Sequence, residues 1–117
     1  MTALQMKQYG GKDVLGLNQN APKPAAGKGQ VLIEVHGASI NPIDWKIRAG
    51  YLKDHLPLTM PATFGGDVAG VVAGVGDSVS GLSVGDRVYG YASPVSGGSG
   101  SFAEFVAAMI STVAPAP

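Results

Sequence analysis

The sequence predicts a mainly β fold that closes into a small, partly open β-barrel with one or two short helical turns. Short apolar segments recur at intervals of about eight to twelve residues, a spacing typical of small all-β domains. Glycine supports the same fold, since eleven of the 18 glycines fall between Gly65 and Gly100 and only seven lie in residues 1–64. Valine and alanine fill the intervals between these glycines, so we expect tight turns between strands and not a flexible linker.

Length and composition limit the classes of protein that this chain can belong to. Its 117 residues indicate one domain, large enough to bury roughly two-thirds of its unfolded surface. The eight basic and eight acidic residues cancel, so no basic field attracts nucleic acid. The absence of cysteine excludes disulfides and thiolate metal sites. No apolar run approaches the ~20 residues of a membrane span, and no signal peptide is visible, so we expect a cytoplasmic protein without a membrane span.

Seven segments alternate or concentrate apolar residues in the manner of strands. They are 4–9, 14–18, 30–39, 67–75, 87–92, 101–107 and 109–113. In segment 30–39 the residues Val31, Ile33 and Val35 recur with a period of two, so one aliphatic face is expected to point inward. The small residues of 67–75 permit the backbones of neighbouring strands to approach closely. Residues 94–100 are expected to form a loop, and 114–117 an exit segment.

A short helix is predicted between the strands 30–39 and 67–75. Asn41 precedes a proline, which favours an extended backbone, and it is a suitable N-cap. Pro42 fits the first helical turn, and Gly50 is a typical end signal. Ile43 and Ile47 are four residues apart, so both are expected to face the core.

This helix also concentrates polar groups, namely Asn41, Asp44, Lys46 and Arg48. One interpretation is a well-capped helix with a solvated surface of paired charges. The other is a polar floor to an apolar cleft, in which the Asn41 amide offers a donor and an acceptor to a carboxamide or carbonyl ligand. Lys46 would then place a charge near a phosphate or a reducible carbonyl. The residues alone leave both interpretations open.

Two other patterns do not carry chemistry by themselves. The spacing Gly70-x-x-x-Gly74-x-Gly76 is not a dinucleotide-binding fingerprint, because Val79 replaces the third glycine and no helix follows. The histidines His36 and His55 are isolated, and their spacing to serine and acidic residues predicts no catalytic triad. The region after Gly65 is therefore expected to be a glycine-rich β region.

Four motifs, in order along nearly the whole chain, resemble those of one family. They lie at 38–50 (ASINPIDWKIRAG), 61–76 (PATFGGDVAGVVAGVG), 82–90 (LSVGDRVYG) and 100–106 (GSFAEFV). Together they are similar to the zinc-independent quinone oxidoreductases of the medium-chain dehydrogenase/reductase superfamily. The resemblance implies that residues 1–117 are a GroES-like N-terminal catalytic domain. In this family an NADPH-binding Rossmann domain follows, which is absent from this chain, so the chain alone is expected to be inactive.

The same resemblance implies that the site contains no zinc. Zinc-dependent relatives place a cysteine at the position of Asn41 and a histidine at that of Gly66. Asparagine and glycine offer neither a thiolate nor an imidazole, and Asp67 alone does not make a tetrahedral site. Gly66 and Asp67 are therefore expected to have structural roles.

The remaining site residues follow from the resemblance as well. Asn41 would lie near the nicotinamide and the substrate carbonyl, with Pro42 and Lys46 beside the cofactor. Asp44 would hold the loop by accepting hydrogen bonds from backbone donors. Tyr51 and Phe64 would form the wall of the substrate site.

The resemblance implies a reductase that transfers hydride from NADPH to a quinone or an α,β-unsaturated carbonyl compound. Amide or ammonium groups near the developing enolate oxygen would stabilise it. The parent protein is expected to be a homodimer. The alternative is a stand-alone GroES-like binding module that presents its cleft or loops to a partner without catalysis.

Overall fold

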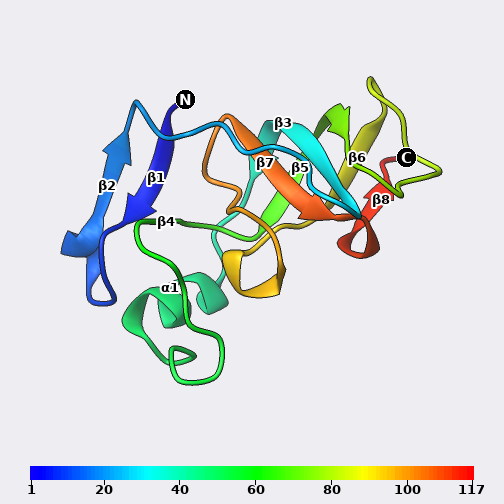
Figure 1. Cartoon of the computed structure of the whole chain (residues 1–117). Coiled ribbons are helices and arrows are strands. Elements are labelled where there is room, and N and C mark those ends of the chain that lie inside the picture. Colours follow the sequence, from blue (N-terminus) through cyan, green and yellow to red (C-terminus); the bar gives the residue numbers. More distant parts are fainter.

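The computed structural model describes all 117 residues, which form two antiparallel sheets and one α-helix (Figure 1). A three-stranded sheet has the order β2-β1-β4, with bounds Leu15–Asn18, Ala3–Met6 and Ala62–Thr63. A five-stranded sheet has the order β7-β3-β5-β6-β8, with bounds Phe105–Met109, Gln30–Ala38, Asp67–Val75, Arg87–Tyr91 and Val113–Pro115. The larger sheet curls into a half-barrel, so the predicted mainly β, partly open GroES-like barrel is confirmed.

Strands β3 and β5 form the centre of the larger sheet. Val31 and Ile33 of β3 are fully buried in a core of nine apolar residues, and Val35 packs partly buried against it. The inward aliphatic face predicted for this strand is therefore confirmed. Glycine at position 70 allows the close approach of β5 to β3, because a Cβ there would lie 2.0 Å from the Glu34 carbonyl oxygen.

Helix α1 spans Pro42–Ala49, between the N-cap Asn41 and Gly50, which ends it in the left-handed conformation. Ile47 is buried as predicted, but Ile43 is 36% exposed, so the prediction that it faces the core is wrong. The inward pair is Asp44 and Ile47, which are three residues apart and share a face. On the inward face of the helix Asp44 thus takes the place expected for Ile43, so a buried position goes to a carboxylate.

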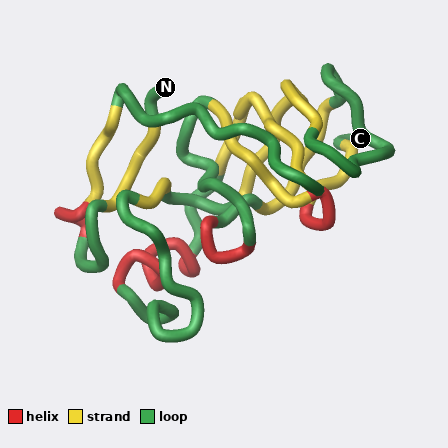
Figure 2. The backbone as a smooth tube through the Cα atoms, viewed as in Figure 1, coloured by secondary structure: helices red, strands yellow, loops and turns green.

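A second, smaller core joins α1 to the three-stranded sheet. It consists of Met6, Val14, Ile47 and Ala62, with partly buried side chains around it. Figure 1 shows α1 beside this sheet and away from the five-stranded sheet. The chain segments that cross between the two sheets are mostly loops, as Figure 2 shows. The polar start of α1 therefore stands where the two parts of the molecule meet.

Several further details differ from the sequence-based expectations. Strand β4 was not expected, and three short 3-10 helices occur at Lys12–Val14, Pro94–Ser96 and Ile110–Thr112. The last of them shows that the strand expected at 109–113 is wrong. Strand β7 begins at Phe105 and not at residue 101, while β1 ends at Met6 and not at residue 9. The expected exit segment 114–117 contributes to β8, because β6 offers it an antiparallel partner. Strands β4 and β8 depend on pairing with β1 and β6, which are distant in the sequence. The structure contains no helix that is long and apolar enough to cross a membrane.

Candidate active site

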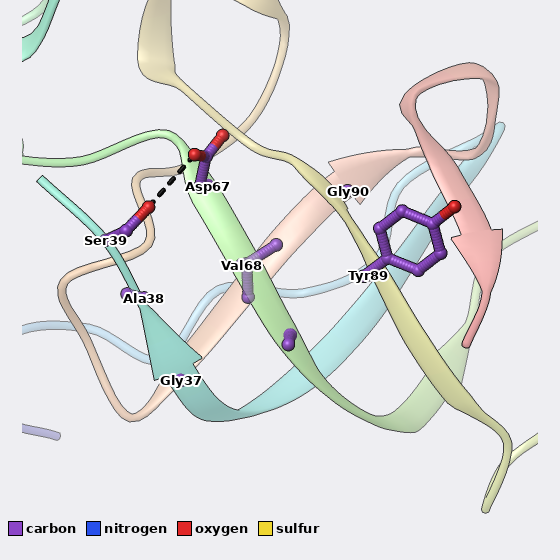
Figure 3. Close-up of a pocket in the computed structure, with 8 residues that line it drawn as sticks. Gly37, Ala38, Ser39, Asp67, Val68, Tyr89 and Gly90 are labelled. Carbon is purple, nitrogen blue, oxygen red and sulfur yellow. Dashed lines mark hydrogen bonds between the residues drawn. The ribbon is translucent and has the colours of Figure 1, made fainter. Parts of the chain in front are cut away.

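A cleft of about 400 Å³ opens where β3, β5 and β6 lie side by side (Figure 3). Its lining residues are Gly37, Ala38, Ser39, Asp67, Val68, Ala69, Tyr89 and Gly90. The strands supply backbone and mostly small side chains, with Ser39 and Asp67 at one end of the cleft and the Tyr89 ring at the other (Figure 3). A mostly apolar hollow with a few placed polar groups is the usual form of a small-molecule site.

The polar end of the cleft is a hydrogen-bonded cluster of three side chains, here called the polar corner: Ser39, Asn41 and Asp67. The Asn41 Nδ2 group donates to Asp67 Oδ2 at 2.7 Å and to Ser39 Oγ at 3.4 Å. Ser39 Oγ donates to the same carboxylate oxygen at 3.0 Å, as Figure 3 shows. The three residues follow the end of β3, cap α1 and begin β5, so the topology brings them together.

Asp44 lies directly beneath this corner. Its Oδ2 accepts the backbone N–H of Asn41 at 2.9 Å, and the two residues form a capping box. The side chain is only 3% exposed. Burial raises the pKa of the Asp44 carboxyl above its ordinary value of 3.8, the Asn41 N–H opposes the rise, and the nearby Asp67 carboxylate adds to it.

Gly66, immediately before Asp67, is buried against an aromatic ring. A Cβ built at this position would lie 2.2 Å from Cε1 of Tyr91. The ring therefore occupies the space that a larger side chain at position 66 would need. Across the whole chain, no group of three or more His, Asp or Glu side chains gathers in a way that could hold a metal ion.

The other predicted site residues lie around α1. Pro42 opens the helix and is exposed. Lys46 is exposed, and its side chain forms no hydrogen bond or ion pair; its Nζ lies 5.9 Å from the centre of the Trp45 ring. Tyr51 is 64% exposed and meets Trp45 edge to face at 5.4 Å. The side chains of Lys46, Trp45 and Tyr51 form an exposed aromatic and cationic surface next to the corner, and none of them is hydrogen-bonded to the Asn41 side chain.

Phe64 has a different environment from Tyr51. It is only 5% exposed and packs edge to face on Phe102 at 5.4 Å. The structure thus places one of the two residues expected in the substrate wall on the surface and the other inside. Their roles toward a substrate remain predictions.

Two residues of the cleft received no role from sequence reasoning, namely Ser39 and Tyr89. Ser39 lies within the motif that precedes the helix, but a serine after a strand is not distinctive by itself. Tyr89 follows the buried Val88 on β6 and is itself exposed, and the sequence alone does not distinguish it from other strand residues.

Comparisons with known proteins agree with the fold of the chain. Residues 27–117 match the family model described as the alcohol dehydrogenase GroES-like domain. The quinone oxidoreductase of Mus musculus is 42% identical over 117 residues, which are all of this chain and 34% of that protein. A mycobacterial quinone oxidoreductase structure superposes with a TM-score of 0.85 at 34% identity, again over the whole chain and 34% of the relative. A mycobacterial structure complexed with NADPH gives a TM-score of 0.83 at 33% identity, over all of this chain and 34% of that one.

The fold and the family match define the class of protein. The chain belongs to the alcohol dehydrogenase GroES-like domain family. The relatives named above that match it over its full length include proteins called quinone oxidoreductase, which agrees with the resemblance of its four motifs. It spans about a third of the length of the curated relatives that it matches.

Proposed function

We propose that residues 1–117 are the N-terminal catalytic domain of an NADPH-dependent, zinc-independent reductase that acts on a quinone or an α,β-unsaturated carbonyl compound. The observation that carries the proposal is the polar corner of Ser39, Asn41 and Asp67 at the end of a mostly apolar cleft. Relatives named quinone oxidoreductase match this chain over its full length. The bulk of the cofactor would be held by a following Rossmann domain.

The groups in the cleft fit a nicotinamide. The small side chains of β3 and β5 leave room for a ring, and the corner offers hydrogen-bonding atoms for a carboxamide. A related structure is complexed with NADPH, which supports the same cofactor here. When bound, NADPH supplies a hydride to the substrate, and a proton from solvent or protein completes the two-electron reduction.

This chain's own residues would bind and orient the reactants. Asn41 would lie beside the nicotinamide, with Pro42 and Lys46 at the rim of the cofactor site. The exposed Lys46 ammonium would stabilise negative charge on a phosphate or on the substrate oxygen. Tyr51 would offer an aromatic wall to a planar substrate, with Phe64 behind it.

Absence of zinc is part of the proposal. An amide at position 41 and glycine at position 66 supply none of the thiolate or imidazole ligands that zinc prefers. The Tyr91 ring beside Gly66 supports this, because it occupies the space in which a ligand side chain at position 66 would stand. The carbonyl would then be polarised by protein groups and not by a metal ion.

The proposal is tested by reading the open reading frame past Pro117 and assaying the longer protein. A downstream glycine-rich βαβ sequence, with enzyme-dependent loss of NADPH absorbance on addition of a quinone, is expected. The 117-residue chain in the same assay is expected to show no turnover. A native stop codon after Pro117 would favour the stand-alone binding module. Steady turnover by the 117-residue chain would contradict the proposal that catalysis requires a following Rossmann domain.

We propose that the parent protein is a homodimer in the cytoplasm that binds a small-molecule substrate and no nucleic acid, since basic and acidic residues balance at eight each. A light-scattering mass of the longer protein equal to two chains is expected. A mass of one chain over a wide concentration range would contradict the dimer.

A further inference from the structure

The three side-chain donor hydrogens of the polar corner, two on Asn41 and one on Ser39, are all directed at other members of the corner. The two hydrogens of the Asn41 Nδ2 group point to Asp67 Oδ2 and Ser39 Oγ, at 2.7 and 3.4 Å. The hydroxyl hydrogen of Ser39 points to Asp67 Oδ2 at 3.0 Å. A carboxylate only accepts hydrogen bonds, so this arrangement fixes which atom of the Asn41 amide faces Asp67.

The atoms that remain for a ligand are therefore acceptors. The Asn41 amide oxygen faces the first turn of α1, where it completes the capping box with Asp44. Asp67 Oδ1 forms no hydrogen bond within the chain. Ser101 Oγ is the one buried side-chain polar atom without a partner, so the unbonded Asp67 Oδ1 is open to solvent. Asp67 also lines the cleft itself.

We propose that Asp67 is the hydrogen-bonding residue of this cleft: Asn41 and Ser39 hold its carboxylate, and its free Oδ1 binds a ligand group that donates an N–H or O–H. The inference rests on the proposed function, in which that group is the primary carboxamide of the nicotinamide. Asn41 and Ser39 are then positioning residues. Because an anionic, acceptor-only corner repels an enolate oxygen, Asn41 does not act as the oxyanion donor, and that role falls to a group outside the corner.

The ligand part of this inference is tested by binding, without turnover. The longer protein is titrated with NADPH and with the reduced acetylpyridine analogue, in which a methyl group replaces the carboxamide NH2 and the carbonyl remains. A lost hydrogen bond to a charged group corresponds to about tenfold or more in Kd, so wild type should prefer NADPH by at least that factor. Equal Kd values for the two compounds would overturn the inference.

The variant Asp67→Asn sharpens the test because it keeps the shape of the side chain and replaces the acceptor Oδ1 by a donor NH2. Its amide oxygen would accept from Asn41 and Ser39, and its NH2 would face the cleft and donate to the carbonyl that both compounds share. The Kd ratio should fall from about tenfold or more to about one. Asp77→Asn, in an exposed turn, is the matched control and should keep the wild-type ratio. An unchanged ratio in Asp67→Asn would contradict the assignment.

The geometry itself is tested on the 117-residue chain by NMR. Exchange of the Asn41 side-chain amide hydrogens should be about tenfold or more slower than that of the exposed Asn20, which has no side-chain partner, and Asp67→Ala should remove most of this protection. Equal exchange at Asn41 and Asn20 in wild type would overturn the closed cluster. Failure of the longer protein to bind NADPH at all would instead overturn the proposed function and, with it, the identity of the ligand.

Discussion

The five-stranded sheet and the region around α1 differ in how completely they bury their apolar side chains. The sheet encloses a core of nine buried residues, whereas the region around α1 has four, and several of its large apolar side chains are exposed. Among the exposed ones are Trp45, Tyr51 and Leu56. The sheet thus contains the larger core of the fold, and the region around α1 leaves aromatic and charged side chains accessible next to it.

The polar corner lies between these two regions, and its residues come from both. Asp67 begins the central strand β5, while Asn41 caps α1. The rigid sheet fixes the carboxylate, and the helix brings the amide that holds it. Functional groups at the ends of rigid elements are positioned more precisely than groups on free loops.

The largest effect is expected from Ile33→Ala in the sheet core. Ile33 is fully buried, so the cavity and the lost burial should lower the free energy of unfolding by about 2–5 kcal/mol. Urea denaturation of the 117-residue chain measures this change in the free energy of unfolding. The matched control is Ile43→Ala on α1, which should cost less than about 1 kcal/mol because the side chain is partly exposed. Equal losses for the two variants would remove the distinction between the regions.

A smaller loss is expected from Gly66→Ala, next to the corner. The added Cβ would collide with the Tyr91 ring, and moving that ring should cost about 1–3 kcal/mol. Gly16→Ala on strand β2 is the control, because no atom lies within 4 Å of the added Cβ. Stability curves for both variants check this. A Gly66→Ala variant as stable as Gly16→Ala would show that the space at position 66 is not closed.

Asp44→Asn is expected to change how stability depends on pH. Because the folded-state pKa of Asp44 is raised above 3.8, the folded chain keeps this proton after the unfolded chain has lost it. The free energy of unfolding of wild type therefore falls as the pH rises from 3.8 through the folded-state pKa. Asp44→Asn lacks this fall, so its stability relative to wild type should increase over the same range.

The control for that experiment is Asp44→Ala. It removes the acceptor for the Asn41 backbone N–H, so it should be less stable than Asp44→Asn at every pH, by about 1 kcal/mol. Denaturation midpoints at several pH values give both comparisons. A constant difference between wild type and Asp44→Asn across the pH range would contradict the raised pKa.

The smallest effect on stability is expected from Lys46→Ala. The side chain is exposed and forms no hydrogen bond or ion pair, so unfolding free energy should change by less than about 0.5 kcal/mol. In the longer protein the same change should lower kcat/KM if the ammonium acts as proposed. An unchanged kcat/KM would remove Lys46 from the proposed site.

Local patterns in the sequence predicted the central strands β3 and β5 and the helix α1. The period of two in β3, the small residues of β5 and the capping signals of α1 gave those elements with nearly their observed bounds. Hydrophobicity predicted that Ile43 faces the core, but this side chain is partly exposed. The buried position on α1 is taken by Asp44, whose carboxylate accepts a backbone N–H. Strand β8 was missed because its pairing with β6 depends on a distant segment.

The candidate site was predictable only in part for the same reason. Asn41 stood out because it caps a polar helix next to proline. Its contact with Asp67 joins residues 26 apart, and the contact of Ser39 with Asp67 joins residues 28 apart. Such a cluster depends on how β3 and β5 pair, and the bulges in that pairing are not visible in the sequence. The direction in which each donor points required the three-dimensional structure.

The most direct test of the central claim is an experimental structure of the longer protein with NADPH bound. The claim predicts the carboxamide nitrogen within about 2.7–3.2 Å of Asp67 Oδ1, with the Asn41 amide still donating to Oδ2 of the same carboxylate. A nicotinamide bound outside the cleft would contradict it. So would an Asn41 amide that has turned away from Asp67 to donate to the ligand.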